Sequence, residues 1–194
     1  MAEYRKHPPL DSTPVDAVSD EQTLVEAARS DPNAFSELYL HHQAPIFRYL
    51  LARAGNEEDA LDMMQQTFLQ ALEHLPEYRD RGLPFSAWLF RIARNAATDL
   101  QRRSRPASPW DLVPDALWPV SGDTTAAAAV ANERRAALAM ALGRLTEDQR
   151  ELLALRFGSD LTFREIGHVV GRSEGAVRKQ IHRVLRTVRE HHGT

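Results

Sequence analysis

The sequence predicts an all-α protein made of two small helical domains joined by a flexible linker. Apolar residues recur at steps of three and four along two long blocks, which is the period of amphipathic helices. β-branched runs are scarce and aromatic residues make up only 7% of the chain, so a sheet is disfavoured. Between the blocks lies a stretch with four prolines and no helical period, which is typical of a linker.

These observations divide the 194 residues into four parts. Residues 1–19 are polar, contain several prolines and lack periodicity, so we expect a disordered N-terminal extension. The first helical block comprises residues 20–104, with Asp20 as a candidate N-cap, and the linker comprises residues 105–126. The helical pattern then resumes in a second block, residues 127–194.

Helix boundaries in the first block can be read from its capping residues. Asp31 and Pro32 are the residue types of an N-cap and a first helical position. Gly55 followed by Asn56 favours the end of one helix and the start of the next. Between these signals Pro45 removes a backbone donor, which predicts a kink or break in the second helix.

The segment 57–75 has the pattern of an amphipathic helix. Its apolar stripe consists of Leu61, Met64, Phe68, Leu72 and Leu75. A polar stripe beside it consists of Asp59, Asp62, Gln66 and Gln70. Acidic residues in a first turn are ordinary because they complement the helix dipole. The polar stripe equally fits a docking surface for a partner protein, and both interpretations stay open.

The segment 84–103 predicts a helix that begins at Pro84 and has one apolar and one basic face. The apolar residues are Phe85, Trp88, Leu89, Ile92, Ala96 and Leu100. The other face carries Arg91, Arg94, Thr98 and Arg102, with Asn95 and Asp99 one turn apart. The preceding loop holds Tyr78, Arg79 and Arg81. A ring beside cations suits single-stranded nucleic acid, and a solvated arginine face is the alternative.

The last fifty residues contain two helical patterns around a short glycine-containing turn. The core-spaced residues of the first pattern are Phe163, Ile166, Val169 and Val170. Gly171 is placed where a left-handed residue ends a helix, and Ser173 is a good N-cap for the next one. This arrangement predicts a helix-turn-helix, which places its second helix in the DNA major groove.

The second helix of this motif separates an apolar face from a basic face. The apolar face consists of Val177, Ile181, Val184, Leu185 and Val188. The basic face consists of Arg178, Lys179, His182, Arg183 and Arg186. Because the apolar face fixes the orientation of the helix, the basic residues must point outward. They either read DNA or form the solvated surface of an ordinary helical hairpin.

The composition limits the cellular compartment of the protein and the kinds of site that it can form. The chain has no cysteine, which excludes disulfides, thiolate zinc sites and a cysteine nucleophile. No apolar run approaches the roughly 20 residues of a membrane span, and the N-terminus lacks the apolar core of a signal peptide. We therefore expect a cytoplasmic protein. The net charge of −3 argues against tight binding to free DNA, although basic residues are clustered locally.

Two other functional classes fit the sequence less well. An enzyme is disfavoured because the eight histidines show no metal-ligand spacing and no phosphate-loop motif occurs, so we expect no metal and no cofactor. A conventional helix-turn-helix repressor or activator would bind duplex DNA by itself. Such proteins usually dimerise, and the sequence shows no additional dimerisation helix or ligand-sized domain.

Four motifs in a fixed order resemble those of bacterial sigma factors of the sigma-70 class. They are DPNAFSELY, EDALDMMQQTFLQALEHL, YRDRGLPFSAWLFRIARNAATDLQRR and LTEDQRELLALRFGSDLTFREIGHVVGRSEGAVRKQIHRVLR. The two-domain form, without longer middle domains, resembles the extracytoplasmic-function (ECF) group over Asp20 to Arg189. The resemblance implies a non-enzymatic factor that binds core RNA polymerase, directs it to −10 and −35 promoter elements and promotes DNA melting.

The first block resembles sigma region 2, and the resemblance implies two sets of contacts there. The helix 57–75 matches the segment that docks on the clamp helices of the polymerase β′ subunit. The implied contacts are Asp59, Asp62, Gln65 and Gln66, the last standing where the family often has Glu. The loop 77–83 and the helix 84–103 match segments that melt the promoter and capture a flipped −10 base. The implied −10 contacts are Tyr78, Arg79, Arg81, Arg91, Arg94, Asn95 and Arg102.

The second block resembles sigma region 4, which reads the −35 element and touches the polymerase β flap. The implied −35 contacts are Ser173, Ala176, Arg178, Lys179, His182, Arg183 and Arg186. Many members of the family are held inactive by an anti-sigma factor. Control by such a partner is therefore a further expectation from the resemblance.

Overall fold

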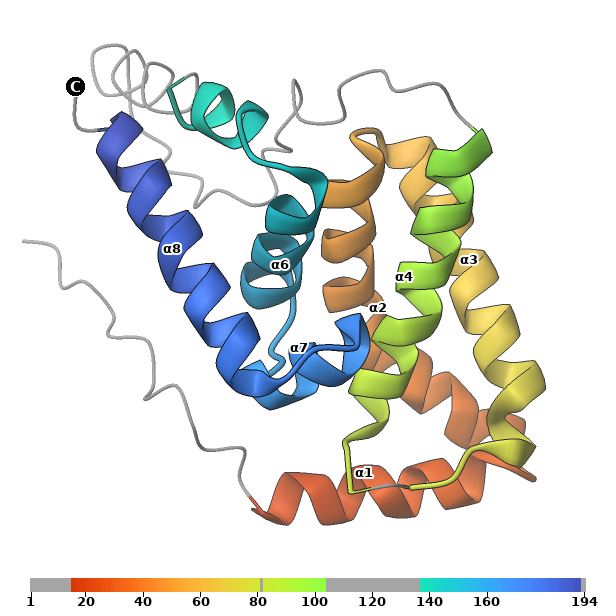
Figure 1. The fold of residues 1–194 in the computed structure, drawn as a ribbon. Coiled ribbons are helices and arrows are strands. Elements are labelled where there is room, and N and C mark those ends of the chain that lie inside the picture. Colours follow the sequence, from red (N-terminus) through yellow and green to blue (C-terminus); the bar gives the residue numbers. More distant parts are fainter. Residues whose placement is uncertain (1–14, 81, 104–136, 193–194) are drawn as a thin grey trace, which may run out of the picture.

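The computed structural model describes residues 15–80, 82–103 and 137–192 (Figure 1). Every regular element in these ranges is helical, and they contain no β-strand, in agreement with the predicted all-α class. The expected linker, 105–126, and the start of the second block lie outside the described residues. So does Arg81, one of the predicted −10 contacts.

In the described part of the N-terminal half, residues 15–80 and 82–103, the helical unit contains four α-helices and one short 3-10 helix. These elements are α1 (Val15–Ala28), α2 (Pro32–Ala54), α3 (Glu57–His74), η1 (Leu75–Glu77) and α4 (Phe85–Arg103). Helix α2 lies at the centre and contacts each of the other three α-helices (Figure 1). A loop connects η1 to α4, and its described residues include Tyr78 and Arg79.

Most of the predicted capping signals in this unit are confirmed. The Asp31 carboxylate accepts a hydrogen bond from the backbone N–H of Asn33 at 2.9 Å. Gly55 ends α2 in the left-handed conformation with φ 77°, and the Asn56 side chain caps α3. These three residues fix the lengths of the two helices because their side chains and backbone angles satisfy helix-end groups locally.

Two predictions about this unit are corrected. Helix α1 begins at Val15, so Asp20 is not its N-cap and part of the extension predicted to be disordered is helical. Helix α2 continues through Pro45, so of the predicted kink or break the break does not occur. Ile46 and Tyr49 on the following turn are fully buried, and their burial holds this part of α2 in the core.

Within the described residues 137–192, the C-terminal helical unit contains three α-helices and a short helical stretch at 137–143. The α-helices are α6 (Glu147–Gly158), α7 (Phe163–Val170) and α8 (Glu174–His192). A capping box starts α6: Thr146 accepts from the Gln149 backbone N–H, and the Gln149 side chain accepts from the Thr146 N–H. Helices α7 and α8 meet at the glycine-containing turn.

The two units pack against each other rather than standing apart. Their buried residues form one continuous apolar cluster, with Leu50 of α2 and Leu89 of α4 on one side and Leu155 of α6 on the other. Helix α6 contacts α2, and α7 contacts α4 (Figure 1). The candidate binding faces of α3, α4 and α8 therefore lie around one shared apolar interior.

Candidate nucleic-acid interface

The turn between α7 and α8 has the local chemistry that the sequence predicts. A capping box between Thr162 and Glu165 starts α7, and Gly171 ends it in the left-handed conformation with φ 72°. The Ser173 hydroxyl then accepts a hydrogen bond from the Ala176 N–H at 3.3 Å at the start of α8. Each helix end is satisfied locally, so the angle between the two helices is set by the turn and by their shared core.

The orientation of α8 follows from its apolar face. Val177, Ile181 and Val184 are at most 2% exposed, as the sequence predicts. The face turned to solvent contains every predicted −35 contact: Ser173, Ala176, Arg178, Lys179, His182, Arg183 and Arg186. Four of these seven side chains are cationic, and a fifth, His182, can gain a proton. These five lie along the exposed side of α8, and the major groove of DNA is wide enough to admit an α-helix.

Arg178 is held lightly against the preceding helix. Its guanidinium donates to the Glu174 carboxylate at 2.7 Å and lies 5.2 Å from the centre of the Phe163 ring. Exposed pairs of this kind contribute only about 0.3–0.5 kcal/mol, and a cation–π contact at an exposed site about 0.5–1 kcal/mol. These contacts orient Arg178 near the start of α8, and they are weak enough to be replaced by hydrogen bonds to a DNA base.

An aromatic pocket lies at the junction of η1, the following loop and α4. Tyr78 packs edge-on against Phe85, with ring centres 5.6 Å apart, and obliquely against Trp88 at 5.0 Å. The pocket beside these rings has a volume of about 500 Å³, and Arg79 and Arg91 line it. Rings that can stack on a base and cations that can pair with phosphate thus share one hollow.

Tyr78 is fixed in this pocket by its backbone as well as its ring. The Arg29 guanidinium donates to the Tyr78 carbonyl oxygen, which ties the loop to α1. Burial, with the nearby carboxylates of Asp80 and Glu21, raises the pKa of the Tyr78 phenol to about 12. The raised pKa keeps the phenol neutral beyond the range in which an ordinary tyrosine ionises, and a neutral ring can stack on a base without repelling phosphate.

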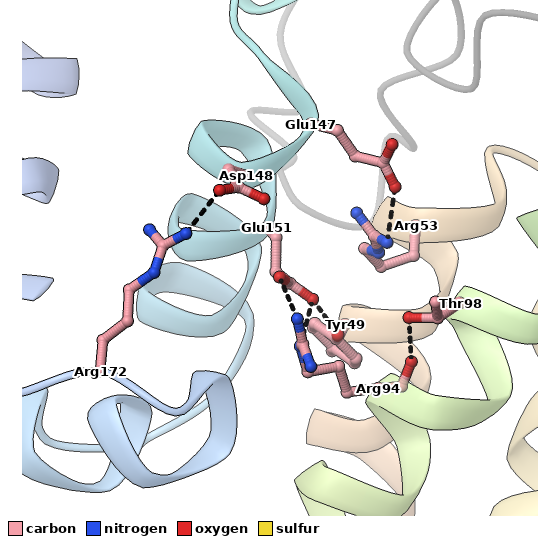
Figure 2. A network of polar contacts seen from close by, with 8 residues as sticks. All are labelled: Tyr49, Arg53, Arg94, Thr98, Glu147, Asp148, Glu151 and Arg172. Atoms are coloured by element: carbon pink, nitrogen blue, oxygen red, sulfur yellow. Dashed lines mark hydrogen bonds and ion pairs between the residues drawn. The ribbon is translucent and has the colours of Figure 1, made fainter.

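The three remaining predicted −10 residues of α4 have different surroundings. Asn95 is exposed on α4, one turn beyond Arg91. Arg102 lies in the last turn of α4, and its side chain lies outside the described residues. Arg94 differs from the expectation of an open phosphate contact, because its guanidinium makes two hydrogen bonds to the Glu151 carboxylate of α6, at 3.0 and 3.3 Å (Figure 2).

The apolar residues of α4 are distributed differently from the predicted stripe. Phe85, Leu89 and Ala96 are buried as predicted, whereas Trp88, Ile92 and Leu100 are only partly buried. The sequence pattern missed four further buried residues, which are Ala87, Phe90, Ala93 and Ala97. Helix α4 is enclosed on more than one side because α2, α3 and α7 all contact it.

Helix α3 exposes the predicted polar stripe. Asp62, Gln65 and Gln66 are exposed, and Asp59 is half-buried. The Asp59 carboxylate accepts a hydrogen bond from the Asn56 side-chain amide at 2.7 Å, which supports the ordinary role of an acidic residue at a helix start. The three exposed residues beyond the first turn have no such local role.

The apolar residues of α3 do not all face the core, contrary to the predicted stripe. Leu61 is 44% exposed and Leu72 is 46% exposed, and Leu69, which lies off that stripe, is 56% exposed. The buried face instead consists of Ala60, Met63, Thr67, Phe68 and Ala71. The three exposed leucines, with Phe35, Tyr39, Met64, Phe68 and Gln65, surround a shallow hollow of about 370 Å³. An apolar hollow rimmed by polar side chains is typical of a protein interface.

The described residues contain no group of three or more histidines and acidic residues placed to hold a metal ion. None of the helices in the same ranges is long and apolar enough to cross a bilayer.

Comparisons with known proteins agree with this geometry. The family model "Sigma-70 region 2" matches residues 38–106, and the model "Sigma-70, region 4" matches residues 141–190. These segments contain the aromatic pocket with its neighbouring α3 face and the helix-turn-helix, respectively.

Full-length relatives extend the match over both units. The ECF RNA polymerase sigma factor ShbA of Streptomyces griseus is 34% identical over 88% of this chain and 96% of its own length. BldN of Streptomyces coelicolor, also an ECF sigma factor, is 32% identical over 85% of this chain, which spans 63% of BldN. Among solved structures, CnrH in complex with the cytosolic domain of CnrY aligns with a TM-score of 0.65 at 27% identity, covering 88% of this chain and 95% of CnrH. The chain therefore belongs to the ECF group of the sigma-70 family, whose members are transcription-initiation factors and not enzymes.

Proposed function

We propose that this sigma factor binds core RNA polymerase through α3, recognises the −10 element through the aromatic pocket and α4, and reads the −35 element through α8. The observation that carries the proposal is the presence of three chemically different exposed surfaces on one chain. One is apolar with an acidic and amide rim, one combines rings with cations, and one is a basic recognition helix.

The α3 surface suits a protein partner. Leu61, Leu69 and Leu72 offer apolar area, while Asp62 and Gln66 offer polar contacts at its edge. This combination of an apolar centre and a polar rim is the usual anatomy of a protein interface. We assign it to the clamp helices of the polymerase β′ subunit, and we assign contact with the β flap to the C-terminal unit.

The aromatic pocket suits a base that has left the duplex. Unstacking a base costs a few kcal/mol, and capture between side chains offsets this cost. Tyr78 and Trp88 supply ring faces, while Arg79 and Arg91 are placed for the neighbouring phosphates. No nucleotide hydrolysis is needed for such a step, because binding energy alone drives it.

Control by a partner protein is the remaining part of the proposal. CnrH, to which this chain is similar along its length, was solved in complex with the cytosolic domain of CnrY. We propose that an anti-sigma protein likewise binds this chain and covers its polymerase-binding surface. The site of action is the cytoplasm, where the chromosome and the polymerase meet.

The test is assembly on a polymerase. Fluorescently labelled chain is mixed with bacterial core RNA polymerase and separated by gel filtration, and the complex is then tested for binding to double-stranded promoter fragments. We expect stable co-elution, and DNA binding that needs both components. A chain that ignores the polymerase and binds a palindromic duplex as a dimer would instead be a conventional repressor or activator.

A further inference from the structure

Helix α1 has an apolar side in the core and a polar side against the loop that precedes α4. Val25 and Ala28 are at most 5% exposed and anchor α1, which contacts both α2 and α4. The loop 78–84, here named the base-capture loop, runs along α1 before it enters α4 (Figure 1). None of the binding residues inferred above lies on α1, so its polar side has no assigned role.

Two donors from this polar side reach the base-capture loop at different points. Directly after α1, the Arg29 guanidinium donates to the carbonyl oxygen of Tyr78, where the loop begins. The side-chain amide of Gln22, within α1, donates to the Asp80 carboxylate further along the loop. Both contacts join residues that are far apart in the sequence. The loop is therefore held at its start and near its middle by one helical segment.

The carboxylate that Gln22 contacts also shapes the loop itself. One oxygen of Asp80 accepts a hydrogen bond from the Gly82 backbone N–H at 2.7 Å, which closes a short local turn. Gly82 is left-handed in this turn, with φ 72°, a conformation that glycine adopts without steric cost. The other oxygen of Asp80 accepts from Gln22. One carboxylate thus fastens the turn of the loop to α1.

A third residue of α1 holds the end of the loop, where α4 begins. The Phe85 backbone N–H donates to the Glu21 carboxylate at 3.2 Å, across 64 positions of sequence. The first N–H groups of a helix have no partner within it, and the helix dipole favours a negative charge there. The second oxygen of Glu21 lies 3.1 Å from Nε2 of His42 on α2. Because Tyr78 packs against the Phe85 ring, Glu21 fixes one wall of the aromatic pocket.

We propose that α1 is the scaffold of the base-capture loop, and that Glu21, Gln22 and Arg29 are positioning residues for promoter melting. They hold the loop and the start of α4 in the capture geometry before DNA arrives. Three contacts at three separate points of one segment support this role. The proposal rests on the function proposed above, because base capture in the aromatic pocket is part of that function.

The physical gain from such a scaffold is preorganisation. A loop that becomes ordered only when a base binds loses conformational entropy at that moment, and this loss weakens capture. If an untethered loop has the capture geometry in about one molecule in ten, its apparent affinity for a flipped base falls about tenfold. Gln22 and Arg29 are exposed, and exposed polar contacts add little to the stability of a fold. Their removal should therefore change the position of the loop more than the stability of the chain.

The double variant Gln22→Leu, Arg29→Met removes both donors to the loop and keeps side chains of similar size. Glu21 stays in place, so the start of α4 keeps its carboxylate. Arg29→Lys retains a cationic donor and is the conservative variant. Arg144→Met is the matched control, because it makes the same chemical change at an exposed position of the C-terminal unit. Thermal unfolding followed by circular dichroism should give similar melting temperatures for all of these chains.

The order of the loop is measured on the free chain by backbone NMR order parameters at Gly82. Because Arg164 of α7 also donates to the Gly82 carbonyl oxygen, at 3.3 Å, every chain in this measurement carries Arg164→Met. With the α1 contacts intact, the order parameter should be near the value of about 0.85 that is typical of rigid backbone. In the double variant it should fall below about 0.6, while the amides of α2 stay rigid. A loop that remains rigid in the double variant would overturn the scaffold.

The effect on melting is measured with holoenzyme on a duplex promoter selected by run-off transcription. The double variant should form permanganate-reactive open complexes about tenfold more slowly. Its affinity in the closed complex should match wild type, since the tethers act only on base capture. Arg29→Lys and Arg144→Met should open the promoter at nearly the wild-type rate, and a premelted bubble should remove most of the difference.

The outcomes separate the scaffold from a structural role and from the proposed function. Equal loss of closed-complex affinity and of opening, or a lowered melting temperature, would show that the two side chains only stabilise the fold. A mobile loop with wild-type opening would overturn the positioning role. If wild-type holoenzyme opened no promoter, the proposed function would fall, whereas the order parameters of the free chain would still show whether α1 holds the loop.

Discussion

The carbonyl oxygen of Arg172 lies so close to Gly167 that a Cβ atom there would come within 2.6 Å of it. The Arg172 N–H in turn donates to the Gly167 carbonyl oxygen at 2.8 Å. The turn between α7 and α8 therefore folds back onto α7, and only a residue without a side chain permits this. The Arg172 guanidinium adds contacts to Asp148 of α6 and Gln180 of α8 (Figure 2 shows the first). One residue thus links α6, α7 and α8.

Gly167→Ala is expected to destabilise this unit by about 1–3 kcal/mol, because the new methyl group meets backbone that cannot move aside. Urea unfolding followed by circular dichroism measures the change. Gly175→Ala is the control, since a Cβ there meets nothing within 4 Å and alanine favours a helix. Equal stability of the Gly167 variant and wild type would show that the turn adjusts more easily than its geometry indicates.

Charge reversal on α3 tests the docking surface. Asp62 is exposed on α3, next in sequence to Leu61 of the apolar hollow, so Asp62→Arg should leave the helix folded and weaken binding to core polymerase about tenfold, or about 1.4 kcal/mol. Glu73→Arg makes the same change in charge at the other end of α3 and should bind as wild type does. Titration of labelled chain with core polymerase at physiological salt gives both affinities, and similar losses in the two variants would point to general electrostatics.

Loss of Tyr78 from the aromatic pocket and of Asn95 from the exposed face of α4 should affect melting more than initial binding. The double variant Tyr78→Ala, Asn95→Ala removes a ring and an exposed amide from the proposed −10 surface. On duplex promoters it should lose thymines that react with permanganate, because capture no longer offsets the unstacking cost of a few kcal/mol. On a template with a premelted bubble it should recover activity. Equal loss on both templates would indicate a defect in folding.

Two arginines on α8 should make different kinds of contact with DNA. Arg178 lies near the helix start, where base edges are within reach, and Arg186 lies two turns later. Loss of a base contact costs about 1–3 kcal/mol at one position, whereas loss of a phosphate contact weakens all sequences alike. Arg178→Ala should therefore change the preferred −35 sequence, and Arg186→Ala should mainly lower the salt dependence. Binding-site selection with holoenzyme distinguishes them, and an unchanged preference in both variants would remove the base-reading role of Arg178.

The helix-turn-helix could be predicted residue by residue because its determinants are local. Caps such as Ser173, the left-handed Gly171 and the buried Val177 and Ile181 act through neighbours within a few positions. Local signals also placed the end of α2 at Gly55 correctly. At Pro45 the predicted break does not occur, since the surrounding helix is held by burial of residues such as Ile46 and Tyr49 in the core.

The surfaces used by partners were harder to predict because they depend on tertiary contacts. A helical period groups Leu61 and Leu72 but does not say which neighbour covers them, and in the structure none of the described helices covers them fully. The pair between Arg94 and Glu151 joins residues 57 positions apart and depends on how the two units meet. From sequence alone, Arg94 is indistinguishable from the other arginines of its helix.

The most direct test of the account is run-off transcription from a promoter library with purified core polymerase and this chain as the only initiation factor. We expect transcripts from a subset of templates that share two elements, spaced as −10 and −35 elements are, and no specific transcripts without the chain. We also expect Asp62→Arg to reduce all of these transcripts together. A chain that binds core polymerase but yields no template-specific transcript would not be a promoter-directing sigma factor.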